Sequence, residues 1–371
     1  MNNIEEKALK ILSILQEHNH EAYIVGGYVR DKLLNRKSND IDICTSATPK
    51  EIMELFPNTS SPNYGSINII YKNSNFDITT FRKEIKYQDN RLPVKIKYIK
   101  SIKKDLLRRD FTINTICMDK DGNILDILNA KPDLNHKLIK TVGNPRYRLK
   151  EDALRILRAV RFSTILDFKI EPKTKHYLTE YARFLKKLSY QRKKQELDKI
   201  FTSPKKENGI KLLLELNLAE SLKLSNLKNI TACDDLIGIW AQLNVDEIYP
   251  FTKIEKVQMK QIRQLLASDI HDKYNLYCYG LYISTVVYQI KKESISNLNK
   301  IYHEMPIQSS KDIVINGREI AKILNKEPGN YLKEIMIDLE KQIIYNNLSN
   351  TKEELEKYIL NNYQNMKKYQ N

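Results

Sequence analysis

The spacing of apolar residues changes along the chain and predicts two kinds of structure. Residues 4–17 carry apolar side chains at the period of a helix: Ile4, Ala8, Ile11, Leu12 and Leu15. Short segments typical of strands follow, at about residues 23–25, 40–43, 67–71 and 76–81. From about residue 149 to the end, the helical period dominates. The pattern therefore predicts an α+β region followed by an all-α region.

Two local signals refine this prediction. Thr48 and Glu51 form a capping box with Pro49 at the first helical position, which predicts a helix to about Phe56. Between about residues 83 and 96 the periodic pattern is lost, and the polar segment 88–93 lies at its centre. We expect a mobile loop there, and such loops are often functional.

A glycine pair and a carboxylate pair stand close together near the start of the chain. Gly26 and Gly27 follow the first strand and would let the backbone approach a phosphate group closely. Asp40 and Asp42 are two residues apart on the second strand, so their side chains point to one face. Such a pair suits Mg²⁺, which takes one or two carboxylates plus substrate phosphates. Taken alone, the pair is also compatible with a solvated strand.

Together with Arg30 and Asp31, this segment resembles motif A of the tRNA nucleotidyltransferases and poly(A) polymerases, within the DNA polymerase β superfamily. The strand 77–82 resembles the family's acidic-x-Thr-Thr-Phe-Arg sequence, which implies that Asp77 is a third catalytic carboxylate beside Asp40 and Asp42. The segment 119–126 occupies the position of motif C.

The segment 108–114 resembles motif B almost letter for letter. In isolation its charged residues would be compatible with a structural ion-pair network. The resemblance implies instead that Arg108 and Arg109 donate to the triphosphate or sugar, while Asp110 and Asn114 hold the ribose or orient those arginines.

The segment 151–161 resembles motif D and is expected on one continuous helix from about residue 149. The resemblance implies that Asp152 and Arg155 select the base, and that Arg158 and Arg161 also belong to the nucleotide site. Hydrogen-bond polarity supports base selection, because a carboxylate accepts from the exocyclic amine of C or A while a guanidinium donates to the neighbouring ring nitrogen. U and G present a carbonyl and a ring N–H at these two positions, so neither hydrogen bond can form. The alternative is an ordinary ion pair on a helix surface.

The composition of the chain predicts an anionic partner. The net charge of +16 and pI near 9.3 favour phosphate binding, although the abundance of Lys, Asn and Ile throughout also suggests composition bias. The four cysteines lack metal-ligand spacing and are expected to be reduced thiols. With no long apolar run and no signal peptide, we expect a soluble cytoplasmic protein that binds no membrane.

The resemblance implies a class II tRNA nucleotidyltransferase with a polymerase-β-like head and helical neck, body and tail. We place the catalytic head at 1–142, the base-reading neck at 143–203, the body at 204–270 and the tRNA-binding tail at 271–371. The expected partners are CTP, ATP and the acceptor end and elbow of tRNA, with Mg²⁺ as cofactor. Asp89 and Arg91 would belong to the flexible loop that the family needs for A addition.

Three alternatives stay open at this stage. An enzyme adding only the terminal A, beside a separate CC-adding enzyme, would share these motifs. A bacterial poly(A) polymerase would share motif A, but residues 64–70 replace the basic segment expected after its carboxylate strand. A non-catalytic RNA-binding protein would be expected to lack Asp40 or Asp42. The sequence does not give the oligomeric state.

Overall fold

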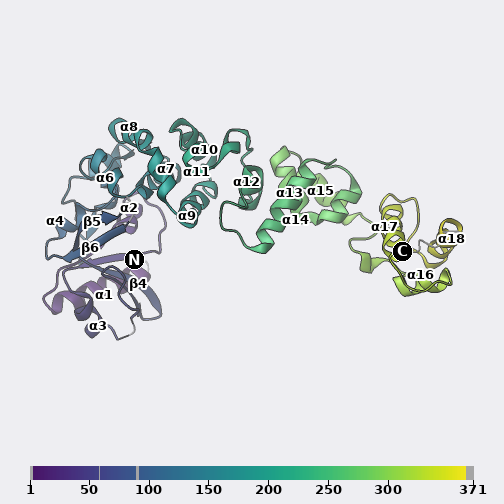
Figure 1. The fold of residues 1–371 in the computed structure, drawn as a ribbon. Helices are drawn as coiled ribbons and strands as arrows, with labels where there is room; N and C mark the ends of the chain where they lie inside the picture. Colours follow the sequence, from purple (N-terminus) through teal and green to yellow (C-terminus); the bar gives the residue numbers. More distant parts are fainter. Residues whose placement is uncertain (1–2, 58, 89–91, 365–371) are drawn as a thin grey trace. The chain divides into compact units, whose positions relative to one another are not determined.

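A computed structural model describes residues 3–57, 59–88 and 92–364 of the protein (Figure 1). The chain divides into two compact units, residues 1–228 and 229–371. The first unit contains the sheet and the helices that follow it, and the described part of the second unit contains helices and loops. The α+β prediction is confirmed, whereas the boundaries of neck, body and tail stay predictions.

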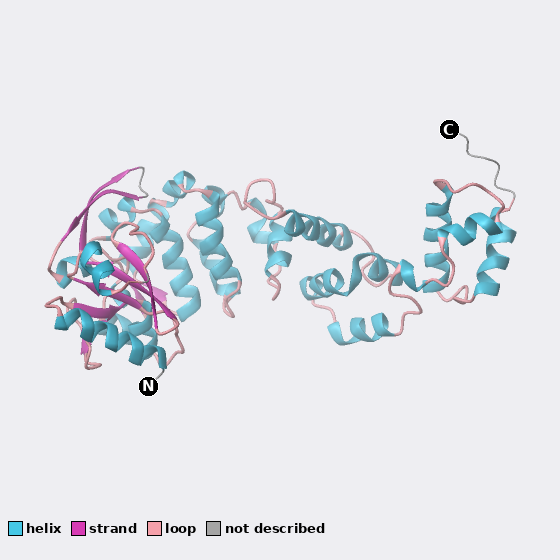
Figure 2. Cartoon of the chain, turned by 90° about the horizontal axis from the view of Figure 1, so that it is seen from below, coloured by secondary structure: helices cyan, strands magenta, loops and turns pink. Residues whose placement is uncertain are grey.

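The sheet of the first unit arranges the strands so that distant segments become neighbours. Its strands are β1 (Ala22–Val25), β2 (Asp42–Thr45), β3 (Ser66–Tyr71), β4 (Ser74–Thr80), β7 (Cys117–Met118) and β8 (Ile124–Leu125). Their order is β3-β4-β2-β1-β7-β8, in which β2 and β4 are parallel and the other neighbours are antiparallel. Figure 2 shows these strands in magenta near the N-terminus.

Five helices and a 3₁₀ turn accompany this sheet in the described residues. They are α1 (Asn3–Glu17), α2 (Gly27–Leu33), α3 (Pro49–Leu55), α4 (Ile102–Leu106) and α5 (Lys131–Asn135), with a 3₁₀ turn η1 (Thr112–Asn114). The predicted face of α1 is buried, including Ile11 and Leu12. The capping box of Thr48 and Glu51 is present at the start of α3. These two helix predictions are confirmed.

The expected loop at residues 83–96 is wrong over the described part of that segment. The structure has a hairpin there, formed by antiparallel β5 (Arg82–Gln88) and β6 (Leu92–Tyr98). The sequence alternates charged residues with Ile, Val and Tyr in both segments, which suits strand pairing. Strand pairing, which a single strand's hydrophobicity does not reveal, stabilises the segment. Asp89 and Arg91 lie outside the described residues.

The helical part of the first unit follows the head directly. It contains α6 (Pro145–Glu151), α7 (Leu154–Leu166), α8 (Pro172–Glu180), η2 (Ala182–Lys187), α9 (Tyr190–Phe201), α10 (Lys206–Glu215), α11 (Ala219–Leu222) and η3 (Ser225–Asn229), with the short strands β9 (Leu138–Ile139) and β10 (Lys169–Ile170). The prediction of one continuous helix through Asp152 is wrong. Asp152 has extended backbone between α6 and α7, and its side chain accepts from the Leu154 N–H at 2.9 Å, so it caps α7.

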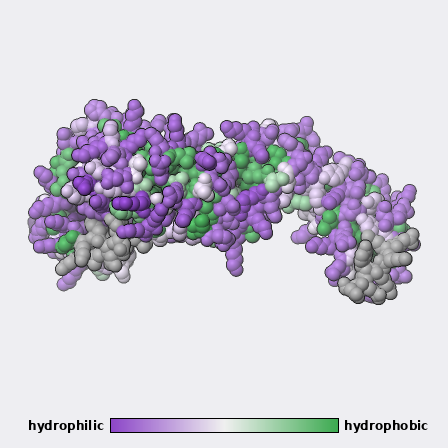
Figure 3. All heavy atoms as spheres, turned by 45° about the horizontal axis from the view of Figure 1, so that its top comes forward, coloured by the Kyte–Doolittle hydropathy of each residue, from purple (hydrophilic) through white to green (hydrophobic). Residues whose placement is uncertain are grey.

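The second unit is helical in its described residues. Its helices are α12 (Leu236–Leu243), α13 (Lys253–Leu266), α14 (Lys273–Lys291), α15 (Ile295–His303), η4 (Ser310–Asp312), α16 (Gly317–Ile323), α17 (Tyr331–Ile344) and α18 (Lys352–Tyr363). Ile320, Ile335 and Leu355 lie in one hydrophobic cluster that joins α16, α17 and α18. Hydrophilic residues cover most of the face shown in Figure 3. Within the described ranges, none of the helices has the length and apolar character needed to cross a bilayer.

Gly209 permits the close packing of α10 against α7 and α9. A Cβ at this position would lie 2.5 Å from Ile200 Cγ2 and 2.7 Å from Thr164 Oγ1. We expect Gly209→Ala to lower the free energy of unfolding by about 1–3 kcal/mol, although alanine favours helix formation, because the core must shift to admit the methyl group. Urea unfolding followed by far-UV circular dichroism measures the change.

The matched control is Asn208→Ala, an exposed position in the same helix. It gains helix propensity without a clash, so its stability should be unchanged or slightly higher. Equal stability of the two variants would contradict the packing role of Gly209.

Candidate active site

Two of the predicted carboxylates lie side by side on two neighbouring interior strands of the sheet. Asp42 is the first residue of β2, and its register partner on the parallel strand β4 is Asp77. Both side chains are exposed, while the neighbouring Ile43 and Ile78 are buried. Asp40 lies before β2 rather than on it, which corrects the expectation that one strand carries the pair. The chain nevertheless brings Asp40 close enough to affect the ionisation of Asp42.

Several neighbouring charges act on the ionisation of the Asp42 carboxyl group. Partial loss of hydration, followed by the negative charge of Asp40 and of Asp77, raises its pKa to about 6 against the opposing charge of Arg109. A carboxyl group that is costly to ionise beside other carboxylates gains from a neighbouring cation. The arrangement therefore favours binding of positive charge at Asp42.

Gly26 brings the backbone against this carboxylate. Its φ of 84° is a conformation that residues with a Cβ rarely adopt. A Cβ there would lie 3.7 Å from Asp42 Oδ2 and 3.5 Å from Arg109 Nη1. Gly27 follows as the first residue of α2. Gly26 thus provides the sharp turn that places α2 next to the carboxylates.

A polar cleft of about 360 Å³ opens beside Asp42. It is lined by Asp42, Ile43, Asn63, Tyr64, Ser66, Thr79, Arg82, Arg108 and Arg109. Three guanidinium groups next to a carboxylate give the cleft separate anionic and cationic regions. A polyphosphate fits that combination, because arginine forms paired hydrogen bonds to phosphate oxygens.

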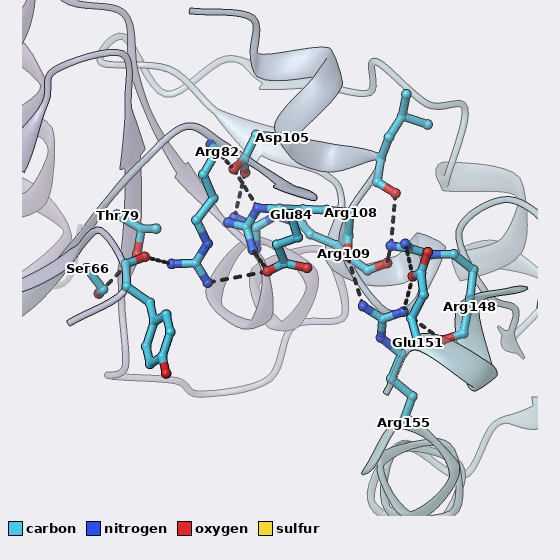
Figure 4. Close-up of polar contacts among 12 residues, drawn as sticks. Ser66, Thr79, Arg82, Glu84, Asp105, Arg108, Arg109, Arg148, Glu151 and Arg155 are labelled. Atoms are coloured by element: carbon cyan, nitrogen blue, oxygen red, sulfur yellow. Dashed lines mark hydrogen bonds and ion pairs between the residues drawn. The ribbon is translucent and has the colours of Figure 1, made fainter. Parts of the chain in front are cut away.

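A buried carboxylate holds these arginines in place (Figure 4). Asp105 is fully buried and accepts from the Arg82 backbone N–H at 3.0 Å and from Arg108 Nε at 2.8 Å. Its second oxygen lies 3.5 Å from Arg109 Nη2. Glu84 on β5 lies 3.4 Å from Arg108 and 3.6 Å from Arg82. The base of the hairpin and the arginine pair therefore form one ionic network.

A second buried network joins motif-B residues to two helices. Asp110 accepts from Asn114 Nδ2 at 3.0 Å, from the Phe111 N–H at 2.8 Å and from Arg158 Nε at 2.7 Å. Asn114 in turn accepts from Arg30 Nη1 at 2.8 Å, and Arg30 also pairs with Asp31. Burial alone would raise the pKa of Asp110, but Arg158, Asn114 and the Phe111 N–H more than offset it and hold the pKa well below its usual range.

The predicted base-reading residues lie at the junction of α6 and α7. Arg155 is buried and donates to the Arg148 carbonyl at 2.7 Å, to Glu151 at 3.0 Å and to the Arg108 carbonyl at 3.3 Å. Asp152 lies three residues before it, and burial raises the pKa of its carboxyl group against the charge of Arg155. Arg155 is thereby tied to the backbone of the arginine pair in the cleft.

Arg161 lies apart from these contacts. Its guanidinium pairs with the buried Glu196 of α9 at 3.0 Å and stacks over Phe162 at 4.4 Å. These contacts join α7 to α9, so they give Arg161 a structural role. Its predicted nucleotide contact is not among them.

Sequence motifs do not predict four residues that contact the candidate site, which are Arg82, Glu84, Asp105 and Arg148. A signal was present for Asp105, since it precedes Arg108 and Arg109 by three and four residues, the spacing of helical ion pairs. Arg148 precedes Glu151 by three residues in the same way. Their importance depends on neighbours from other elements, which spacing does not show.

Comparison with known proteins agrees with this geometry. Three family models match: "Poly A polymerase head domain" at residues 22–140, "Probable RNA and SrmB- binding site of polymerase A" at residues 167–226, and "tRNA nucleotidyltransferase domain 2 putative" at residues 254–359. The CCA-adding enzymes of Geobacillus sp. and Anoxybacillus flavithermus are 32% and 33% identical to the chain. Those alignments cover 96% and 98% of this chain, and the same shares of the two relatives.

Solved structures extend the likeness to three dimensions. The Bacillus stearothermophilus CCA-adding enzyme in complex with CTP matches with a TM-score of 0.86 at 26% identity, covering 97% of this chain and 98% of that one. The Thermotoga maritima CCA-adding enzyme complexed with tRNA matches with a TM-score of 0.69 at 21% identity, covering 96% of this chain and 94% of that one, which shows the fold alone.

The head and the arginine-lined cleft define a nucleotidyltransferase of the poly(A) polymerase type. Within that class, the chain belongs to the CCA-adding enzymes. The resemblance inferred from the motifs is thus confirmed, while the roles of single residues stay predictions.

The Asp110 network predicts a pH-dependent stability. Because the pKa of Asp110 is lower in the folded state than in the unfolded state, its contribution is complete above about pH 4 and is lost as the pH falls further. Asp110→Asn should therefore cost about 3 kcal/mol at pH 7 and progressively less toward pH 2. Calorimetry of the full chain between pH 3 and pH 7 measures this difference.

Asp121→Asn is the matched control, since the Asp121 side chain is exposed and pairs only with the half-buried Lys120 among the contacts described. Its effect should be small at every pH. A cost for Asp110→Asn that is the same at pH 3 and pH 7 would exclude the ionised carboxylate as the cause.

Proposed function

We propose that the protein adds C, C and A, from CTP and ATP, to the 3′ end of tRNA without a nucleic-acid template and releases pyrophosphate. The observation that carries the proposal is the register of Asp42 with Asp77 beside a cleft lined by Arg82, Arg108 and Arg109. Carboxylates beside guanidinium groups in one cleft suit a nucleoside triphosphate whose α-phosphate lies near the carboxylates. A cytoplasmic location stays a prediction from the sequence.

The donor set fits Mg²⁺ bound together with substrate. No group of three or more His, Cys, Asp and Glu side chains in the described segments forms a ready metal cage. Mg²⁺ seldom needs one, since it keeps waters and takes one or two carboxylates plus substrate phosphates. Asp40 and Asp42 would hold it, with Asp77 adjoining. The chemistry supplied by two bound ions is activation of the tRNA 3′-hydroxyl and neutralisation of the leaving pyrophosphate.

The chain's own residues supply binding and selection. Arg82, Arg108 and Arg109 bind phosphate oxygens, and Asp105 keeps the last two in position. Asp152 and Arg155 select the base by accepting from an exocyclic amine and donating to a ring nitrogen. Exposed lysines of α13, including Lys253 and Lys260, are available for tRNA phosphates.

The direct test uses tRNA that lacks its three 3′ nucleotides, incubated with CTP, ATP or both in the presence of Mg²⁺. We expect two C residues from CTP alone and a complete CCA end from both. Asp42→Asn should reduce incorporation of each nucleotide by about 10³-fold, because the metal position is lost. Glu54→Gln, at an exposed position of α3, should retain full activity. Addition of A alone, only to tRNA already ending in CC, would indicate the A-adding alternative, and a poly(A) product would indicate a poly(A) polymerase.

Arg155 provides the test of base selection. Removing its side chain leaves the ring nitrogen of C or A without a donor, which costs about 1–3 kcal/mol, or roughly ten- to a hundredfold in discrimination against U and G. Arg109→Ala should instead reduce incorporation of all four nucleotides alike, since phosphate carries no base identity. Single-nucleotide incorporation of CTP, ATP, UTP and GTP measures both. A uniform loss in Arg155→Ala would remove its role in base selection.

A further inference from the structure

Arg148 connects the two ends of the proposed nucleotide site. It lies on α6, and its side chain is largely buried. One terminal nitrogen donates to the Leu107 carbonyl at 2.9 Å and to the Arg109 carbonyl at 2.8 Å. The other terminal nitrogen pairs with Glu151. Figure 4 shows Arg148, Glu151 and Arg155 together, beside the backbone of Arg108 and Arg109.

The same residue also contacts Arg155 through its backbone. The Arg148 carbonyl accepts from Arg155 Nη1, and Glu151 accepts from both arginines. Arg155 itself donates to the carbonyl of Arg108. Three consecutive carbonyls, of residues 107, 108 and 109, are therefore held by two guanidinium groups that share one carboxylate.

This arrangement fixes a distance that nucleotide selection requires. Arg108 and Arg109 line the cleft for the phosphates, and Arg155 is the proposed donor to the base. Among the described contacts, the side chains of Arg148 and Arg155 are the ones that join the backbone of Arg108 and Arg109 to α6 and α7. A misplacement of about 1 Å between catalytic groups can cost about a hundredfold in rate.

We propose that Arg148 is a positioning residue for base selection, which holds Arg155 at a fixed distance from the phosphate-binding arginines. The inference rests on the proposed function and deepens it. Arginine suits the role because its planar fork donates in several fixed directions at once, whereas a lysine ammonium is a single point charge. Arg148 needs no contact with the nucleotide.

The experiment compares R148Q and R148K with R146Q in the full-length enzyme. Arg146 is an exposed residue of the same helix, so R146Q removes the same charge without touching the carbonyls of residues 107 and 109. Steady-state incorporation of CTP and UTP into tRNA lacking its three 3′ nucleotides, and of ATP and GTP into tRNA ending in CC, gives kcat and KM for each. Thermal melting and tRNA binding report on folding.

In R148Q we expect the preference for CTP over UTP, and for ATP over GTP, to fall by about 10- to 100-fold, as expected when a base-reading donor is misplaced. R148K should recover part of the activity toward CTP while the preference stays relaxed, since charge returns without the fork. R146Q should match the wild type. If R148Q does not fold, the same ratios in R148K decide.

Equal loss for all four nucleotides, or unchanged ratios in a folded variant, would overturn the proposal and leave Arg148 a structural residue. Failure of the proposed function is distinguishable, because the wild-type enzyme would then add no nucleotide to the truncated tRNA.

Discussion

The buried charge of Asp110 is the constraint on which the arrangement of the head depends. An ionised carboxylate stays buried only when charged or polar donors surround it, and here the donors come from several places in the chain: Arg158 on α7, Asn114 in η1 and the adjacent backbone. Asn114 in turn accepts a hydrogen bond from Arg30 of α2. One carboxylate therefore fixes α2, η1 and α7 relative to one another, and with them the glycine turn and the arginine pair.

Register is the second constraint. Because β2 and β4 are parallel neighbours in which Asp42 faces Asp77, the two carboxylates meet although 35 residues separate them in the chain. A shift of one residue would place Ile43 or Ile78 at the exposed position and bury a carboxylate in the core. Burial of Ile43 and Ile78 thus fixes the positions of the two exposed carboxylates.

The arginines of the first unit serve two different purposes. Arg82, Arg108 and Arg109 are partly exposed in the cleft and are held by Asp105 and Glu84. Arg30, Arg158 and Arg161 surround the ring of Phe162 within 5.3 Å and pair with Asp31, Asp110 and Glu196. The first group lines the cleft in which we propose that phosphate binds, while the contacts of the second group join α2, α7 and α9.

The sequence by itself determined what depends on local spacing and on motif chemistry. The amphipathic α1, the capping box of α3 and the α+β head with an all-α remainder follow from periodicity. The glycine turn, the carboxylates and the Arg108-Arg109-Asp110 string gave the family, because their residue types in that order are specific to its chemistry.

Only the tertiary structure decided the features that depend on neighbours distant in the chain. The hairpin of β5 and β6 forms because the two strands pair, and neither strand is apolar enough to be predicted from its sequence alone. The break between α6 and α7 depends on the side chain of Asp152, which caps the second helix instead of continuing the first. Asp105 and Arg148 are connected to the candidate site by hydrogen bonds to the backbone of other elements. Such bonds cannot be predicted from sequence, because every residue has a backbone carbonyl and nearly every residue a backbone N–H. Local patterns specify elements, whereas buried charges and shared acceptors specify how the elements meet.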